Sequence, residues 1–191
     1  MTIRQFQRTL EQDLAALGAE SPRFDAAQLL RWLSGQDQAW LIAHTGDACP
    51  EDWQARSVDA LHRLESGEPL QYLLGEWEFY GLPLAVGPGV LIPRADTETV
   101  VETCLQALAP VRDPAIWDLC SGSGAIALAL ASRRPDARIL AAELSEEALP
   151  YLRQNIAALA PDRVTAVQTD VLTQLPDGLC DLIVSNPPYI P

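Results

Sequence analysis

The residues most able to do chemistry begin with a glycine-containing segment that runs from Asp118 to Gly124 with the sequence DLCSGSG. Its two glycines tolerate positive φ angles and let the backbone approach a ligand closely. Glu143 lies 19 residues beyond Gly124. At the end of a neighbouring strand, its carboxylate could accept hydrogen bonds from both hydroxyls of an adenosine ribose. Gly122 to Ala127 also fits the relaxed dinucleotide pattern, so a nicotinamide enzyme and a glycine-rich turn without a ligand both remain open.

A second candidate site is the tetrapeptide NPPY, which runs from Asn186 to Tyr189. Its two prolines remove two backbone donors and keep the segment extended, so carbonyl oxygens there are available to a ligand. Asn186 adds a side-chain carbonyl oxygen, and Tyr189 offers a flat face. This combination suits a planar amino group on an sp² carbon, with two acceptors for its N–H bonds and a ring stacked on its plane. The alternative is a plain proline turn that ends a strand.

The elements that must position these residues are predicted from apolar periodicity. Residues 1–75 favour helices, with Thr2 as a cap, Ser21-Pro22 as a second start, and further helices over about 38–44 and 50–67. A hairpin is expected over 76–86, followed by a helix capped by Asp96 or Thr97. After residue 114 the pattern alternates strands (115–119, 138–142, 163–168, 181–185) with helices (125–133, 145–159). This alternation predicts a parallel sheet covered on both faces. If the first and fourth strands are neighbours, the two candidate sites meet at the topological switch point.

Taken together, the glycine loop, the acid and NPPY resemble a class I S-adenosylmethionine-dependent methyltransferase acting on a planar nitrogen. Three upstream segments, GEPLQYLLG (67–75), FYGL (79–82) and VLIPRADTE (90–98), are similar to the peptide chain release factor N5-glutamine methyltransferases. The resemblance covers essentially the whole chain. It implies an α/β fold with a Rossmann-like parallel sheet, preceded by a small all-helical domain and a β-hairpin linker (76–93). The expected domains are 1–75, for substrate or partner recognition, and 76–191, for methyl transfer.

The resemblance also assigns roles to particular residues. The cofactor would be S-adenosylmethionine, with Glu143 on the ribose and Asp170 and Val171 beside the adenine. The full cofactor set would be Asp118, Cys120, Ser121, Gly122, Ser123, Gly124, Glu143, Asp170, Val171 and Asn186. The partner would be a class I release factor, whose Gly-Gly-Gln glutamine would bind Asn186, Pro187, Pro188 and Tyr189. Catalytic roles would fall to Asn186, Pro187 and Tyr189.

Three positions depart from the family pattern. Cys120 replaces a glycine, Glu143 replaces the commoner aspartate, and Ala95-Asp96 replaces Pro-Glu. A cysteine at the first glycine position also resembles the sister enzymes that methylate a glutamine of a large-subunit ribosomal protein, which are the alternative. A non-catalytic module that binds S-adenosylmethionine and a translation factor is the alternative from another class.

Composition excludes several other classes. Hydrophobic residues make up 48% of the 191 residues, charged residues 20%, and the net charge is −13. Neither half has a basic surplus, which disfavours direct nucleic-acid binding and hence a DNA adenine methyltransferase. No apolar run is long enough for a membrane span, and the N-terminus lacks a signal core, so no membrane association and a cytoplasmic location are expected. The four cysteines and two histidines are scattered, so no metal site is expected.

The resemblance implies a sheet with more strands than the four that this sequence supplies. The last predicted strand, 181–185, would then be an edge with exposed apolar side chains. We therefore expect the chain to be a C-terminally truncated methyltransferase that transfers methyl groups weakly or not at all.

Overall fold

The computed structural model describes residues 1–187 and divides into two compact units, with the boundary between Leu74 and Gly75. Each unit has its own hydrophobic core. The first unit is helical, and the second contains both sheets. Among residues 1–187, no helix is long and apolar enough to cross a membrane.

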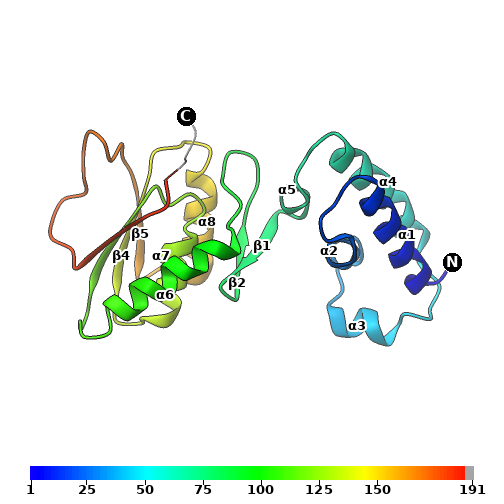
Figure 1. The fold of residues 1–191 in the computed structure, drawn as a ribbon, viewed down its shortest axis with the longest axis horizontal. Helices are drawn as coiled ribbons and strands as arrows, with labels where there is room; N and C mark the ends of the chain where they lie inside the picture. Colours follow the sequence, from blue (N-terminus) through cyan, green and yellow to red (C-terminus); the bar gives the residue numbers. More distant parts are fainter. Residues whose placement is uncertain (188–191) are drawn as a thin grey trace. The chain divides into compact units, whose positions relative to one another are not determined.

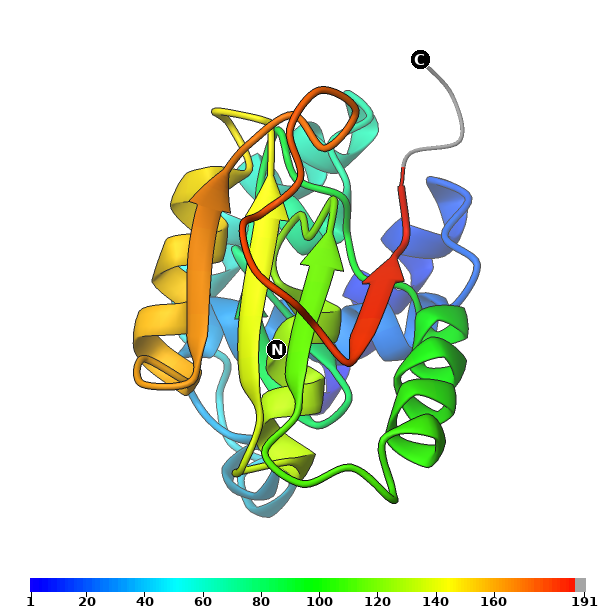
Figure 2. The same cartoon turned by 90° about the vertical axis from the view of Figure 1, so that its left-hand side faces the viewer.

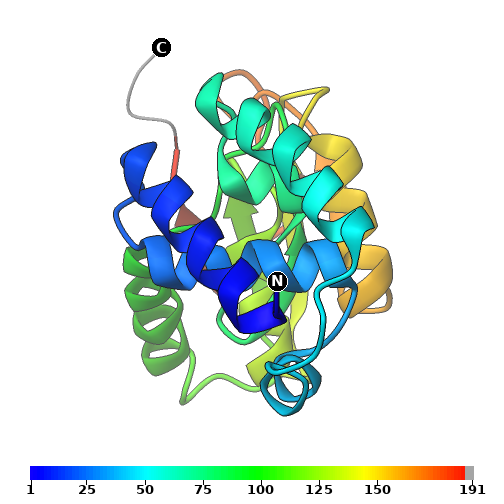
Figure 3. The same ribbon diagram turned by 90° about the vertical axis from the view of Figure 1, so that its right-hand side faces the viewer.

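The first unit consists of short helices packed around one apolar cluster (Figures 1 and 3). They are α1 (Ile3–Ala16), α2 (Pro22–Ser34), α3 (Gln38–Ala43), α4 (Glu51–Glu65) and α5 (Leu70–Leu74). Thr2 caps α1 as expected: its hydroxyl accepts from the Gln5 N–H at 3.3 Å, and the Gln5 side chain accepts from the Thr2 N–H at 2.8 Å. In Figure 3, α2 crosses behind α1 and α4, and its leucines fill the centre of the cluster. The sequence patterns did not reveal the five-residue helix α5.

The second unit opens with the expected hairpin, β1 (Glu76–Phe79) and β2 (Leu82–Ala85). Tyr80 and Gly81, at φ +54° and +76°, form its turn. A 3₁₀ turn, η1 (Ala95–Thr97), then leads into α6 (Glu98–Ala107). Thr97, one of the two residues expected to cap this helix, occupies its N-cap position. Thr97 makes no capping hydrogen bond, and its hydroxyl accepts one from the Asn186 side chain.

The main sheet is parallel, with the order β5-β4-β3-β6 (Figure 2). Its strands are β3 (Ala115–Leu119), β4 (Arg138–Glu143), β5 (Val164–Gln168) and β6 (Leu182–Ser185). The connecting helices are α7 (Ala125–Arg133) and α8 (Leu149–Leu159). The first and fourth strands of this sheet, β3 and β6, are neighbours, which is the arrangement that brings the two candidate sites together.

Helices α6, α7 and α8 cover one face of the sheet (Figures 1 and 2). Coverage of both faces was expected, and in the described part of the chain this was wrong. The segment 169–181 lies on the other side and forms turns instead of a helix. Pro176 and Gly178 interrupt it, and two of its leucines, Leu172 and Leu179, are more than 90% exposed.

Candidate functional site

The candidate residues gather at the carboxyl edge of the parallel sheet. The loop 120–124 follows β3, Glu143 ends β4, Asp170 lies just beyond β5, and Asn186 follows β6. Strand register aligns these positions, because Leu119 pairs with both Ala142 and Ser185, and Glu143 pairs with Gln168. Segments far apart in sequence therefore meet at one end of the sheet (Figure 2). Ligands of open α/β sheets bind at this edge.

The loop between β3 and α7 is held in a conformation that favours glycine. Cys120, Gly122 and Gly124 all have positive φ, at +59°, +56° and +83°. A Cβ at Gly124 would come within 2.7 Å of a Leu152 methyl group, so α7 and α8 pack too closely there for a side chain. Cys120 adopts the left-handed region without being glycine, which strains the backbone at the start of the loop.

Asp118 lies at the foot of this loop and is 1% exposed. Its Oδ2 accepts a hydrogen bond from the Ala127 N–H at 3.1 Å, and its Oδ1 has no partner among residues 1–187. Burial raises the pKa of Asp118 to about 7, and the negative charge of Glu143 contributes in the same direction. An unsatisfied buried acceptor at the foot of a glycine loop fits a site that a polar ligand completes.

Glu143 reaches back across the loop from the end of β4. Its Oε2 accepts from the Gly122 N–H at 2.7 Å, and its Oε1 accepts from the Leu144 and Ser145 N–H groups at 2.8 Å each. Its carboxylate therefore lies directly beside the glycine loop. Together with the unsatisfied oxygen of Asp118, this geometry fits a ligand that carries hydroxyl donors and positive charge, such as the adenosine and sulfonium parts of S-adenosylmethionine.

The remaining predicted cofactor positions vary in how they are held. Ser121 is buried, and its hydroxyl donates to the Asp118 and Ala142 carbonyls; Ser123 is also buried. Asp170 is half-buried, and its Oδ1 accepts from the Leu172 N–H at 3.0 Å, while Val171 is half-buried beside it. Burial raises the pKa of the Cys120 thiol.

The amide-binding candidates lie at the end of β6. The Asn186 Nδ2 donates to the Thr97 hydroxyl at 3.4 Å, which joins the segment 90–98 to the NPPY tetrapeptide across 89 residues. Pro187 is exposed. The predicted substrate positions Pro188 and Tyr189 lie outside the described residues.

Sequence reasoning missed Asn155, a buried residue of α8. Its Oδ1 accepts from the Ala85 N–H at 2.7 Å, and its Nδ2 donates to the carbonyls of Ala85 and Ser123 at 3.1 and 2.9 Å. One amide therefore ties the hairpin and the glycine loop to α8. An isolated asparagine in a helical pattern carries no signal of this role.

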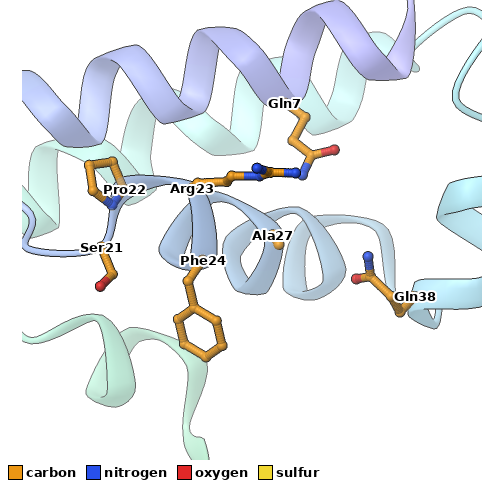
Figure 4. A pocket seen from close by; sticks show the side chains of 7 residues that line it. All are labelled: Gln7, Ser21, Pro22, Arg23, Phe24, Ala27 and Gln38. Carbon is orange, nitrogen blue, oxygen red and sulfur yellow. The ribbon is translucent and has the colours of Figure 1, made fainter.

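A separate hollow lies in the helical unit (Figure 4). Its lining includes Gln7 from α1, Arg23 and Phe24 from the first turn of α2, and Gln38 from α3. The Phe24 ring projects outward from α2 and is 51% exposed, and the Arg23 side chain extends towards Gln7. A half-exposed aromatic ring next to a cation is a combination that protein interfaces favour.

The family comparisons match both units. Residues 95–190 match the methyltransferase small domain, and residues 5–75 match the PrmC N-terminal domain. Relatives named release factor glutamine methyltransferase are 48% identical in Streptomyces coelicolor and 42% identical in both Moorella thermoacetica and Escherichia coli. They align with 94%, 100% and 97% of this chain, respectively. The chain spans 63%, 68% and 67% of their lengths.

Among solved structures, wild-type Trm5b from Pyrococcus abyssi aligns with a TM-score of 0.50 at 19% identity. The alignment covers 60% of this chain and 34% of that chain, and it supports the fold alone. The order of the parallel strands, the glycine loop and the small-domain match define a class I methyltransferase fold. The chain belongs to the release factor glutamine methyltransferase family.

Proposed function

We propose that this chain carries the cofactor-binding and amide-binding parts of an enzyme that methylates the glutamine of the Gly-Gly-Gln loop in class I release factors. The observation that carries the proposal is the placement of Glu143, the glycine loop and Asn186 at one edge of the sheet. Glu143 offers a hydrogen-bond acceptor for a nucleoside, and Asn186 offers one for an amide. Because both lie at the same edge, they fit a reaction between a nucleoside cofactor and a side-chain amide. The names of the relatives supply the substrate class.

S-adenosylmethionine, when bound, supplies a methyl group activated by a sulfonium. The residues proposed to hold it are the loop 120–124, with Glu143 at the ribose and Asp170 and Val171 beside the adenine. Asp118 lies beneath the loop with one acceptor atom to offer. The half-buried Glu143 adds a negative charge that complements the cation.

The substrate amide would be gripped by Asn186 Oδ1 and the Pro187 carbonyl, each accepting one of its two N–H bonds. This grip fixes the amide plane so that the nitrogen lone pair, which lies perpendicular to that plane, faces the methyl group. Stacking by Tyr189 on the amide plane completes the proposal. The reaction replaces one amide N–H with N–CH₃ and releases the proton to solvent, so the chain contributes mainly positioning and electrostatics.

We assign recognition of the release factor to the helical unit, 1–74, whose hollow at Arg23 and Phe24 offers an exposed ring and a cation. The net charge of −13 favours a protein over a nucleic acid as partner. Such a partner also places the enzyme in the cytoplasm. A large-subunit ribosomal protein remains the alternative substrate, because Cys120 occupies the first glycine position.

The test is incubation of the 191-residue chain with S-adenosylmethionine and, separately, a release factor, a large-subunit ribosomal protein and duplex DNA. We expect the Gly-Gly-Gln peptide to gain the mass of one methylene under single-turnover conditions. Methylation of ribosomal protein or DNA but not of release factor would contradict the substrate assignment.

Phe24→Ala should weaken release factor binding without changing the affinity for S-adenosylhomocysteine, whereas Val58→Ala, at an exposed position on α4, serves as the matched control.

A binding-only role is the second candidate function, because Glu143 and the glycine loop that it contacts could hold the cofactor whether or not a substrate amide is methylated. In that case calorimetry would detect S-adenosylhomocysteine binding, while no substrate would gain mass.

A further inference from the structure

Glu143 has a hydrogen-bonding arrangement that its expected role as ribose acceptor does not require. Its carboxylate accepts three backbone N–H bonds, from Gly122 in the loop after β3 and from Leu144 and Ser145 just after β4. The Gly122 bond, at 2.7 Å, links residues 21 positions apart. The other two donors are next to Glu143 in sequence and fix the orientation of the carboxylate.

Counting lone pairs shows how much of this carboxylate is already used. Each carboxylate oxygen accepts about two hydrogen bonds. Oε1 accepts from both Leu144 and Ser145, so its capacity is filled. Oε2 accepts from Gly122 and retains one position. A ribose brings two hydroxyl donors, so both can bind only if one backbone N–H leaves.

Gly122 is the donor best able to leave. It has a φ of +56°, and among the described residues the nearest atom to a Cβ built on it is a Val90 methyl carbon, at 3.8 Å, so this side of the residue is not crowded. Its neighbour Ser121 is anchored independently, because its N–H donates to the Ala142 carbonyl at 3.0 Å and its hydroxyl also donates there. The Ser121 N–H therefore keeps β3 and β4 joined when the Gly122 N–H turns away, and the bond that must break with that turn is the one that the Ser121 carbonyl accepts from the Gly124 N–H at 2.8 Å.

We propose that Glu143 acts as a latch on the glycine loop. Without a ligand it holds the loop through the Gly122 N–H, and on binding a nucleoside with both ribose hydroxyls it exchanges that bond for one to a hydroxyl. The identity of the ligand as an adenosine-containing cofactor rests on the proposed function; the latch in the unliganded protein does not. Glutamate suits this role better than aspartate, because its extra methylene lets the carboxylate reach across from β4 to Gly122.

The first arm of the test needs no ligand. Amide hydrogen exchange at Gly122 is measured by NMR in the 191-residue chain, in Glu143→Asp and in the matched control Glu146→Asp, at an exposed glutamate. We expect exchange to be roughly tenfold faster or more in Glu143→Asp only, as for loss of one hydrogen bond to a charged acceptor. A thermal melt of each variant shows whether the protein remains folded. Equal Gly122 exchange in all three folded proteins would overturn the latch.

The second arm follows the same amide during titration with adenosine, 2′-deoxyadenosine and 3′-deoxyadenosine. Adenosine should deprotect Gly122, whereas each deoxynucleoside, with one hydroxyl for the remaining Oε2 position, should leave it protected. Unchanged protection in the adenosine-bound protein would overturn the exchange. Failure of adenosine and S-adenosylhomocysteine to bind at all would contradict the proposed function and the exchange together, while the unliganded arm would still decide the latch.

Discussion

The proposed chemistry depends most directly on the side chain of Asn186. The Asn186 Nδ2 donates to the Thr97 hydroxyl. This hydrogen bond fixes the orientation of the side-chain amide and distinguishes its Nδ2 end from its Oδ1 end. Asn186→Ala removes a side-chain acceptor for the substrate amide. We expect kcat for release factor methylation to fall by roughly 10²-fold, the scale of losing one preorganised catalytic hydrogen bond. Labelled methyl transfer measures the change.

Variants at Thr97 separate an effect on the orientation of the Asn186 amide from an effect on folding. Thr97→Val removes the hydroxyl but keeps the side-chain volume, and Thr97→Ser restores the hydroxyl. The valine variant should lower kcat and the serine variant should recover it, with the same melting temperature in both. Turnover in Asn186→Ala equal to that of the unmodified chain would contradict the proposed role.

Asp118 should give the protein a stability that depends on pH. Burial raises its pKa in the folded state to about 7, well above the value of an exposed carboxyl. Below the pKa that Asp118 has in the unfolded state, both the folded and the unfolded protein hold the proton, and the contribution of Asp118 to the free energy of unfolding is fully present. As the pH rises towards 7, the unfolded state has released its proton while the folded state retains it, so the free energy of unfolding falls by up to ~1.4 kcal/mol per pH unit.

Urea unfolding at a series of pH values measures this slope. Asp118→Asn keeps the shape and cannot titrate, so its unfolding free energy should change less between about pH 4 and 7. An identical pH dependence in both proteins would show that other groups are responsible.

At the scale of elements, the close approach of α7 and α8 depends on Gly124. An added Cβ would meet Leu152 at 2.7 Å, and the φ of +83° is unfavourable for other residues. Gly124→Ala should therefore lower the free energy of unfolding by about 1–3 kcal/mol. Gly178→Ala is the matched control, because Gly178 has a φ of +108° but open space around it. Thermal melts that show equal losses would mean that backbone strain alone, and not the helix contact, is responsible.

Local patterns predicted the elements that local forces determine. The strand 115–119 and the helix 125–133 have the bounds expected, because each is a short apolar run ended by turn-forming or polar residues. The helix expected from 145 begins at Leu149, after a turn over 146–148 that the Ser145 hydroxyl stabilises by accepting from the Ala148 N–H.

Long-range contacts were not predictable in the same way. The partners of Asn155 lie 70 and 32 residues away, so its role depends on how three elements meet. The Thr97 contact with Asn186 spans 89 residues, and no local pattern indicates it. The loop and Glu143 were visible because a glycine pattern and a fixed spacing identify them before folding is known.

At the scale of the whole molecule, β6 is an edge strand of the described sheet, and Ile183 on it is 53% exposed. An exposed apolar edge favours pairing between chains. Ile183→Lys should shift the chain towards monomer, as measured by sedimentation at several concentrations. Val58→Lys places the same charge at a similarly exposed position on α4, in the other unit, and should not. Equal effects would indicate that net charge, and not the edge, controls self-association.

The pairing of β3 with β6 also has a consequence for the time course of synthesis. The Asp181 N–H donates to the carbonyl of Ala115, 66 residues earlier, so one side of β3 has no strand partner until the ribosome has also made residues 181–185. Contacts of this range form slowly, whereas helices packed through nearby residues form fast. The nascent polypeptide therefore passes through a stage in which the helical unit can already fold while β3, with Ile116 and Trp117, is not yet paired with β6. That interval is when a chaperone has most to protect.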